Sequence, residues 1–145
     1  MRVLCVCLGN ICRSPTAEAV LRKLAGDHMT VDSAGTGGWH ISDPPYGPAI
    51  KAAKARGYDL SKLRARKFDV QDFQNFGLIL AMDRQNLADI EALRPQGSKT
   101  PVCLMLDFAP EVAASEVPDP YYTGDFDEAL DLIEHAARGV LKTHT

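Results

Sequence analysis

The sequence lacks any apolar stretch of the roughly 20 residues that a helix needs to span a bilayer. Its opening residues 1–8 are apolar, but they carry one basic residue and no small-residue cleavage site, and Gly9 follows too early for a signal peptide. Repeats, low-complexity tracts and linkers are also missing. We therefore predict one domain, residues 1–145, that has no membrane partner.

The chain also has no excess of basic residues. Its 16 Lys and Arg residues stand against 19 Asp and Glu residues, which gives a formal net charge of −3. A nucleic-acid-binding surface usually carries a basic excess, so we expect no nucleic-acid partner. Hydrophobic residues at 46% and charged residues at 24% are instead typical of a globular domain.

Cysteine is scarce, and its spacing suits neither a disulfide framework nor a metal site. Three of the four cysteines fall within eight residues, so we predict free thiols in a reducing, cytoplasmic compartment. No Cys-x2-Cys or His-x3-His spacing occurs, and we expect no metal and no other cofactor. We also expect Cys5 and Cys7 to face opposite sides of a strand, and Cys103 to be buried and inert.

Alternating strand and helix patterns predict an α/β fold with a parallel sheet and helices on both faces. Short apolar runs predict strands at residues 2–7, 30–34, 78–82 and 101–106. Amphipathic patterns and capping signals predict five helices. The first begins at Pro15, and the others cover residues 48–56, 69–76, 83–93 and 125–141. The long segment 107–124 is predicted to be a functional loop.

The first predicted strand runs directly into a loop and a helix whose residues suit anion binding. The segment is Cys7-Leu8-Gly9-Asn10-Ile11-Cys12-Arg13-Ser14. Five residues between Cys and Arg form a semicircle of inward-pointing backbone N–H groups, and the positive end of the helix dipole adds to it. Such a site stabilises a thiolate, and Arg13 offers a planar fork to phosphoryl oxygens.

An ordinary buried cysteine in a strand–helix turn is the alternative interpretation, because Cys-x5-Arg occurs often by chance. The strand–loop–helix context and Ser14 favour phosphate chemistry. The segment CLGNICRSPTAEAV resembles the signature of the low-molecular-weight protein tyrosine phosphatases, and DSAGT, AMDRQNL and PDPYY resemble further segments of that family. The resemblance implies a three-layer α/β/α fold, a four-stranded parallel sheet of order 2-1-3-4, and metal-independent hydrolysis of phosphotyrosine.

The resemblance also implies roles for individual residues. Cys7 is expected to attack phosphorus and form a phosphocysteine, with Arg13 and the loop amides holding the phosphoryl oxygens. Asp119, which lies between two prolines, is expected to be the general acid; its alternative is a simple turn Asp. The expected substrate is a phosphotyrosine-containing protein or peptide, and the expected state is a monomer or weak dimer.

Further side chains are expected to support the loop or shape the substrate slot. Ser14 is expected to donate to the Cys7 sulfur or to cap the helix, and Asn10 to bond Ser33 or to serve only as a turn residue. The slot residues are expected to be Ile11, Trp39, Tyr121 and Tyr122, although aromatic residues in loops often only pack. Ile11 stands where phosphoarginine-specific relatives often carry Thr.

A second thiol in the loop suggests redox protection. An oxidised Cys7 is expected to be trapped by Cys12 as a disulfide; the alternative is that Cys12 is a small buried hydrophobe. The sequence departs from the family at Leu63, where many relatives have a His that anchors the loop. Two rival functions remain open: arsenate reduction, which needs relay cysteines, and a non-catalytic phosphoanion-binding or redox-sensing module.

Overall fold

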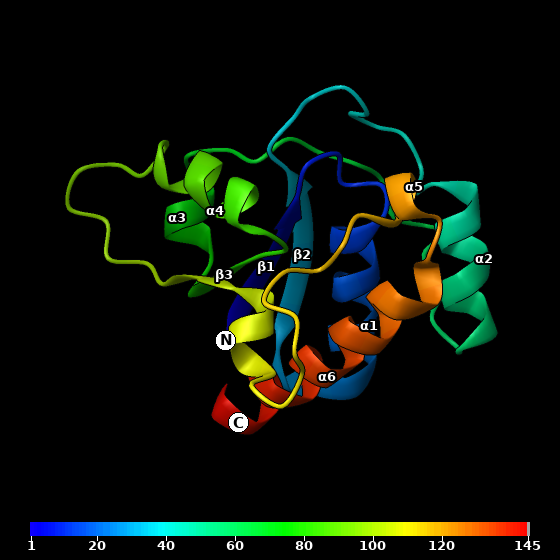
Figure 1. The fold of residues 1–145 in the computed structure, drawn as a ribbon. Helices are drawn as coiled ribbons and strands as arrows, with labels where there is room; N and C mark the ends of the chain where they lie inside the picture. Colours follow the sequence, from blue (N-terminus) through cyan, green and yellow to red (C-terminus); the bar gives the residue numbers. More distant parts are fainter. Residues whose placement is uncertain (145) are drawn as a thin grey trace.

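The computed structural model describes residues 1–144, which form one sheet of four parallel strands and the helices around it (Figure 1). The strands are β1 (Arg2–Cys7), β2 (Thr30–Gly35), β3 (Leu78–Ala81) and β4 (Val102–Leu104). The helices are α1 (Arg13–Ala25), α2 (Gly47–Ala55), α3 (Asp72–Asn75), α4 (Arg84–Glu91), α5 (Pro120–Thr123) and α6 (Phe126–His144), with 3₁₀ turns η1 (Gly26–His28) and η2 (Met105–Phe108). The strand order β2-β1-β3-β4 confirms the predicted topology.

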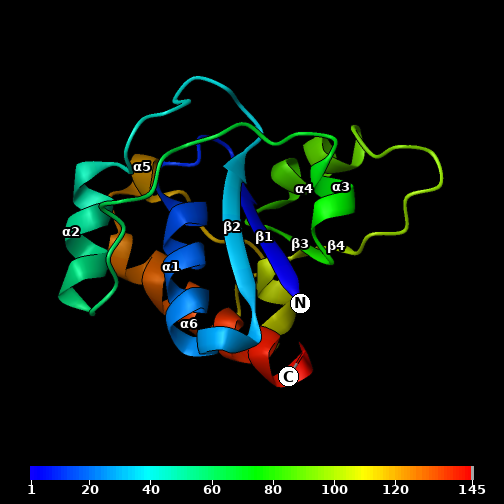
Figure 2. The same cartoon turned by 180° about the vertical axis from the view of Figure 1, so that it is seen from behind.

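Helices cover both faces of the sheet, so the predicted three layers are confirmed. Val3 and Cys5 of β1 pack into the larger core with α1 and α6, whereas Leu4 and Val6 pack into a second core with α3 and α4. Figure 2 shows these two groups of helices on opposite sides of the sheet. Because β1 is central, its residues 3–7 are all buried, as its continuous apolar run predicted.

Several predicted boundaries were wrong. Helix α1 begins at Arg13, so Pro15 is its third residue; proline fits there because the first-turn N–H groups have no partner within the helix. Strand β4 ends at Leu104, where the chain turns into η2. The predicted loop 107–124 contains the end of η2 and the four-residue helix α5.

Two predictions about cysteines were also wrong. Cys5 and Cys7 lie in the same core cluster, because side chains two residues apart on a strand share one face. Cys103 is only partly buried, since β4 is an edge strand. None of the helices found within residues 1–144 combines the length and apolar character needed to cross a membrane.

Candidate active site

The segment between β1 and α1 forms a tight loop at the carboxyl end of a central strand (Figure 1). Cys7 ends β1 and Arg13 begins α1, so residues 8–12 join a strand end to a helix start. Gly35, at the end of β2, packs against this loop: a Cβ there would lie 2.8 Å from the Leu8 carbonyl oxygen. The sheet and the loop can approach this closely only because residue 35 has no side chain.

The Cys7 sulfur has two hydrogen-bond partners, the Asn10 backbone N–H and the Ser14 hydroxyl. Cys7 is 3% exposed, and its Sγ accepts a hydrogen bond from the Asn10 backbone N–H at 3.3 Å. The Ser14 hydroxyl oxygen lies 3.0 Å from the same sulfur. When the sulfur is a thiolate, the hydroxyl is the donor, so the Asn10 N–H and the Ser14 hydroxyl both donate to this atom.

The Asn10 side chain ties the loop to its surroundings. Asn10 has a left-handed backbone (φ 57°), and its Nδ2 donates to Ser14 Oγ at 2.7 Å and to Ser33 Oγ at 3.0 Å. Its Oδ1 accepts from the Arg66 backbone N–H at 3.0 Å. Leu63, which stands where many relatives have a histidine, is partly buried and packs against the core. The hydrogen bonds of Asn10 are therefore made without a histidine at position 63.

Arg13 is buried beside two carboxylates. Its Nη1 donates to Asp83 Oδ2 at 2.7 Å and to the Val117 carbonyl at 3.0 Å, and its Nη2 lies 3.4 Å from Asp119 Oδ2. Burial alone would lower the pKa of Arg13, but the Cys7 sulfur, Asp83 and Asp119 raise it above its ordinary value. Nε is buried without a hydrogen-bond partner among residues 1–144. A donor is therefore free for an anionic ligand.

Asp119 precedes α5 and caps it. Its Oδ1 accepts from the Tyr121 backbone N–H at 3.1 Å, while its Oδ2 faces Arg13. The preceding segment is fixed by the bond from the Val117 N–H to the Met82 carbonyl at 2.9 Å, which ties it to the end of β3. Asp119 is thereby held at the site by local structure on both sides.

A cavity of about 250 Å³ opens above the loop. Loop residues Cys7, Leu8, Gly9, Ile11 and Cys12 line it together with Trp39, His40, Asp119, Tyr121 and Tyr122. The aromatic side chains are exposed, with 73% of Trp39 and 76% of Tyr122 accessible, so they form an open wall rather than a packed core. The sequence-predicted slot residues and the nucleophile candidate thus share one cavity.

Comparison with known proteins decides which family this arrangement represents. The model of the family described as low molecular weight phosphotyrosine protein phosphatase matches residues 2–144. The chain belongs to this family.

Relatives of this phosphatase family match the chain over nearly its full length. The chain is 38% identical to the low molecular weight protein-tyrosine-phosphatase YfkJ of Bacillus subtilis, over 96% of this chain and 92% of that protein. The crystal structure of YfkJ superposes with a TM-score of 0.93 at 37% identity, over 99% and 93% of the two chains. A Schizosaccharomyces pombe low molecular weight phosphotyrosine protein phosphatase is 44% identical over 86% and 83%. The Drosophila arginine phosphatase also superposes, with a TM-score of 0.91 at 30% identity over 100% and 98%.

Cys12, the second thiol of the phosphatase loop, differs from Cys7 in its environment. It is 3% exposed and immediately precedes α1. Burial, Asp119 and Cys7 raise the pKa of Cys12 to about 12, against a lowering effect of Arg13. Cys12 is therefore a neutral thiol near pH 7.

The structure adds three residues to the phosphatase site that the sequence did not identify. Asp83 pairs with Arg13 while its Oδ1 accepts from the Asn86 N–H at 2.7 Å, so it also caps α4. His40 lines the cavity, and its Nδ1 lies 3.2 Å from Asp43 Oδ2. Glu18 is buried and accepts from Ser33 at 2.7 Å. A signal existed for Asp83, because it follows the strand next to β1.

Groups of three or more His, Cys, Asp or Glu side chains that could hold a metal ion do not occur within residues 1–144. The charged partners at the phosphatase site bond one another instead, as Arg13 does with Asp83 and Asp119.

Proposed function

We propose that this chain hydrolyses phosphotyrosine in proteins and peptides, and small aryl phosphates, through a phosphocysteine on Cys7. One observation carries the proposal: Cys7 and Asp119 line one cavity, and Arg13, whose Nη2 lies 3.4 Å from Asp119 Oδ2, has an Nε without a partner among residues 1–144. A nucleophile, an acid and an anion-binding fork therefore surround a space that accepts an aryl phosphate. The family of the chain supports the same activity.

In the first step, the Cys7 thiolate attacks phosphorus in line with the leaving oxygen. The sulfur–phosphorus bond forms while the phosphorus–oxygen bond to the aryl group breaks. Protonated Asp119 transfers its proton to the departing phenolate oxygen, which leaves as a phenol. Asp119 is left as a carboxylate, so charge and protons balance.

Arg13 and the loop amides hold the equatorial phosphoryl oxygens during this transfer. Arg13 is oriented by Asp83 and the Val117 carbonyl, which hold Nη1, while Nη2 faces Asp119 and Nε is left for the phosphoryl group. Donors fixed before substrate arrives need no reorganisation as charge shifts in the transition state.

In the second step, water hydrolyses the phosphocysteine. The Asp119 carboxylate accepts a proton from the attacking water, a new phosphorus–oxygen bond forms, and the sulfur–phosphorus bond breaks. Cys7 leaves as a thiolate, which Ser14 is placed to stabilise from 3.0 Å. The products are inorganic phosphate and an enzyme ready for the next turnover.

The cavity walls favour an aryl substrate. Cys7 is only 3% exposed, so its sulfur lies deep in the cavity. The exposed side chains of Trp39, Tyr121 and Tyr122 form the rim. A phosphotyrosine spans this depth with its ring against the aromatic wall, whereas a phosphoserine is too short. Ile11 lies on the cavity wall. Relatives that prefer phosphoarginine often carry Thr at this position, so Ile11 supports a preference for phosphotyrosine.

We also propose the setting in which this phosphatase works. Its four free thiols support a reducing, cytoplasmic compartment. The exposed aromatic residues beside the cavity are consistent with a monomer that pairs only weakly. Chromatography with light scattering tests this: the proposal expects a monomer mass at low concentration, and a stable larger species would refute it.

Arsenate reduction, the nearest rival, requires relay thiols after the loop. The only later cysteine is Cys103, in β4, and β3 separates that strand from β1. Two strand spacings are about 10 Å, too far for direct exchange with Cys7. The proposal therefore favours ester hydrolysis on the same anion-binding loop.

One set of assays tests the proposed function. Wild type and Cys7→Ser are compared for phosphate release from p-nitrophenyl phosphate, a phosphotyrosine peptide and a phosphoarginine peptide, and in a thioredoxin-coupled arsenate assay. We expect wild type to hydrolyse the two aryl substrates and Cys7→Ser to be inactive. Turnover of arsenate or phosphoarginine alone would refute the proposal, as would phosphate binding without any hydrolysis.

A further inference from the structure

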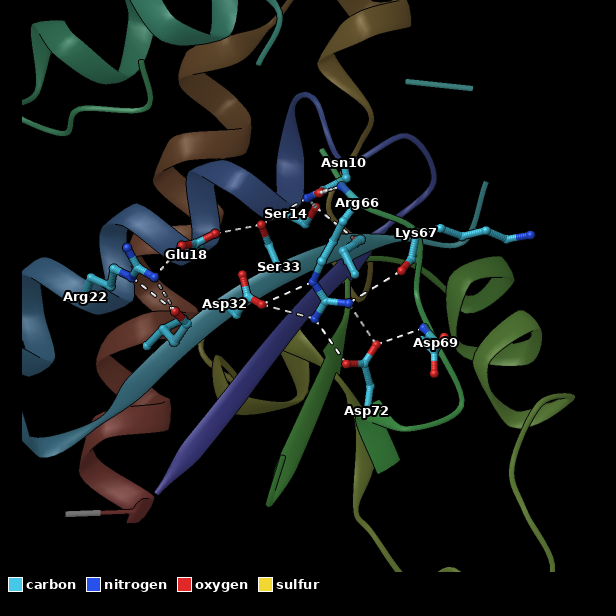
Figure 3. A network of polar contacts seen from close by, with 12 residues as sticks. Asn10, Ser14, Glu18, Arg22, Asp32, Ser33, Arg66, Lys67, Asp69 and Asp72 are labelled. Atoms are coloured by element: carbon cyan, nitrogen blue, oxygen red, sulfur yellow. Dashed lines mark hydrogen bonds and ion pairs between the residues drawn. The ribbon is translucent and has the colours of Figure 1, made fainter. Parts of the chain in front are cut away.

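We propose that Arg66, which touches neither the cavity nor Cys7, is a positioning residue that fixes the phosphate loop through Asn10. The inference rests on the proposed use of that loop in catalysis. Figure 3 shows Arg66 between Asn10 on one side and two carboxylates, Asp32 and Asp72, on the other. The residue thus joins the loop to β2 and to α3.

The first link runs from Arg66 to the loop. The Arg66 backbone N–H donates to Asn10 Oδ1 at 3.0 Å, and this bond orients the amide so that its Nδ2 meets Ser14 and Ser33. Because Asn10 has a left-handed backbone, its conformation has to be maintained by such contacts. Its own N–H points at the Cys7 sulfur, so a shift of Asn10 moves an amide of the anion site.

The second link fixes the backbone of Arg66 itself. Segment 65–68 is not part of a regular strand, yet the Gly35 N–H donates to the Arg66 carbonyl at 2.8 Å and the Phe68 N–H to the Gly35 carbonyl at 2.7 Å. Arg66 therefore lies between the end of β2 and the phosphate loop. A rotation at this residue would break the bond to Asn10 on one side or to Gly35 on the other.

The third link is the guanidinium, which prevents that rotation. Its Nη1 and Nη2 form a two-point pair with Asp72, both at 3.1 Å, and its Nε donates to Asp32 Oδ2 at 3.2 Å. Asp72 is buried at 4% exposure and also accepts from the Asp69 backbone N–H at 2.8 Å, so this anchor is itself rigid. Paired planar contacts of this kind specify orientation in a way that lysine cannot reproduce.

The test replaces Arg66 by Met, which keeps the length of the side chain and removes its charge and donors. We expect kcat with aryl phosphates to fall on the order of tenfold and inorganic phosphate to bind correspondingly weaker, below the ~10²-fold that a 1 Å misplacement can cost. Arg66→Lys keeps the charge but not the two-point pair, so its kcat should stay closer to that of Arg66→Met than to wild type.

Arg56→Met is the matched control. Arg56 also holds several carboxylates, but it joins α2 to α6 and has no contact with the loop; its partners are Asp127, Asp131 and Glu134. We expect this variant to lose thermal stability without a change in kcat or phosphate affinity. If Arg66 acted only through stability, the two variants would behave alike below their unfolding temperatures.

A double-mutant cycle tests whether the effect passes through Asn10. Asn10→Gly removes the amide side chain and tolerates the left-handed backbone. In this background, Arg66→Met should change kcat and phosphate affinity by less than about twofold, since the link is already broken. Full additivity of the two losses would overturn the proposed route.

Other outcomes also decide the inference. Wild-type kcat and phosphate affinity in Arg66→Met, or full activity in Arg66→Lys, would overturn it. If Arg66→Met does not fold, Asp72→Asn replaces it, because Asn keeps the acceptor for the Asp69 N–H and weakens the pair with Arg66. Calorimetry measures the affinity of the loop for inorganic phosphate and needs no turnover. An inactive wild type would refute the proposed function, but this inference could still be tested by phosphate affinity.

Discussion

Replacing Asp119 by Asn changes the proposed acid while keeping its local structural role. Oδ1 accepts from the Tyr121 N–H at the start of α5, and the Asn side chain offers the same oxygen. The cap, worth about 1 kcal/mol, is therefore preserved. The variant loses the transferable proton and the contact of 3.4 Å with Arg13, which still keeps Asp83 and Val117 as partners.

These two losses have different signatures. A positioned acid contributes ~10²–10⁴-fold, or about 2.7–5.5 kcal/mol at 1.36 kcal/mol per tenfold. That loss applies only when the leaving phenolate needs a proton, so it grows as the phenol becomes less acidic. The changed contact with Arg13 acts on the phosphoryl group, which all the substrates share, so it lowers kcat/KM by the same factor for every substrate.

The assay is kcat/KM for a series of aryl phosphates whose phenols differ in acidity. This ratio covers binding through departure of the phenol, so hydrolysis of the phosphocysteine does not enter. We expect a loss of about 10²-fold or more for phosphotyrosine and of less than about tenfold for the most acidic phenol. Equal losses across the series would remove Asp119 from the role of general acid.

The remaining predictions concern oxidation and pH. Peroxide should convert Cys7 to a sulfenic acid. The Cys12 sulfur then attacks the Cys7 sulfur, so that a disulfide forms, the S–O bond breaks and the hydroxyl leaves as water with the thiol proton. Peptide mass spectrometry should find this bridge, and reductant should restore activity in wild type but not in Cys12→Ser. Burial raises the pKa of Glu18, so its protonated form is favoured in the folded state, and the free energy of unfolding should fall as the pH rises from the ordinary range of glutamate through this raised pKa. Urea unfolding should show this fall in wild type and not in Glu18→Gln; parallel pH profiles would contradict it.

Periodicity and apolar runs predicted the architecture because they depend on local sequence. Strand β1 is a continuous apolar run and proved to be central. The helices predicted to start at residues 83 and 125 are real: Asp83 caps α4, and Asp125 accepts from the Glu128 N–H in the first turn of α6. Boundaries failed where tertiary context decides. Helix α1 begins at Arg13 because the loop carries the chain directly into it, and β4 is cut short where η2 begins.

The candidate site was predictable only in part, for a related reason. Cys7, Arg13 and the loop between them are contiguous, so their spacing is visible in the sequence. Asp83 and Glu18, in contrast, join the site through side chains from other strands and helix faces. Their role depends on the fold, because the spacing of residues in the sequence does not show how close Asp83 lies to Arg13 or Glu18 to Ser33.

The central claim is that Cys7 carries the phosphoryl group during turnover. The most direct measurement is an acid quench within the first turnover of a reactive aryl phosphate, followed by mass spectrometry of the peptide that contains the loop. We predict that one phosphoryl group is bound to the Cys7 sulfur, in wild type and in the Cys12→Ser control. Hydrolysis without any phosphorylated loop peptide, or a phosphoryl group on another residue, would contradict the account.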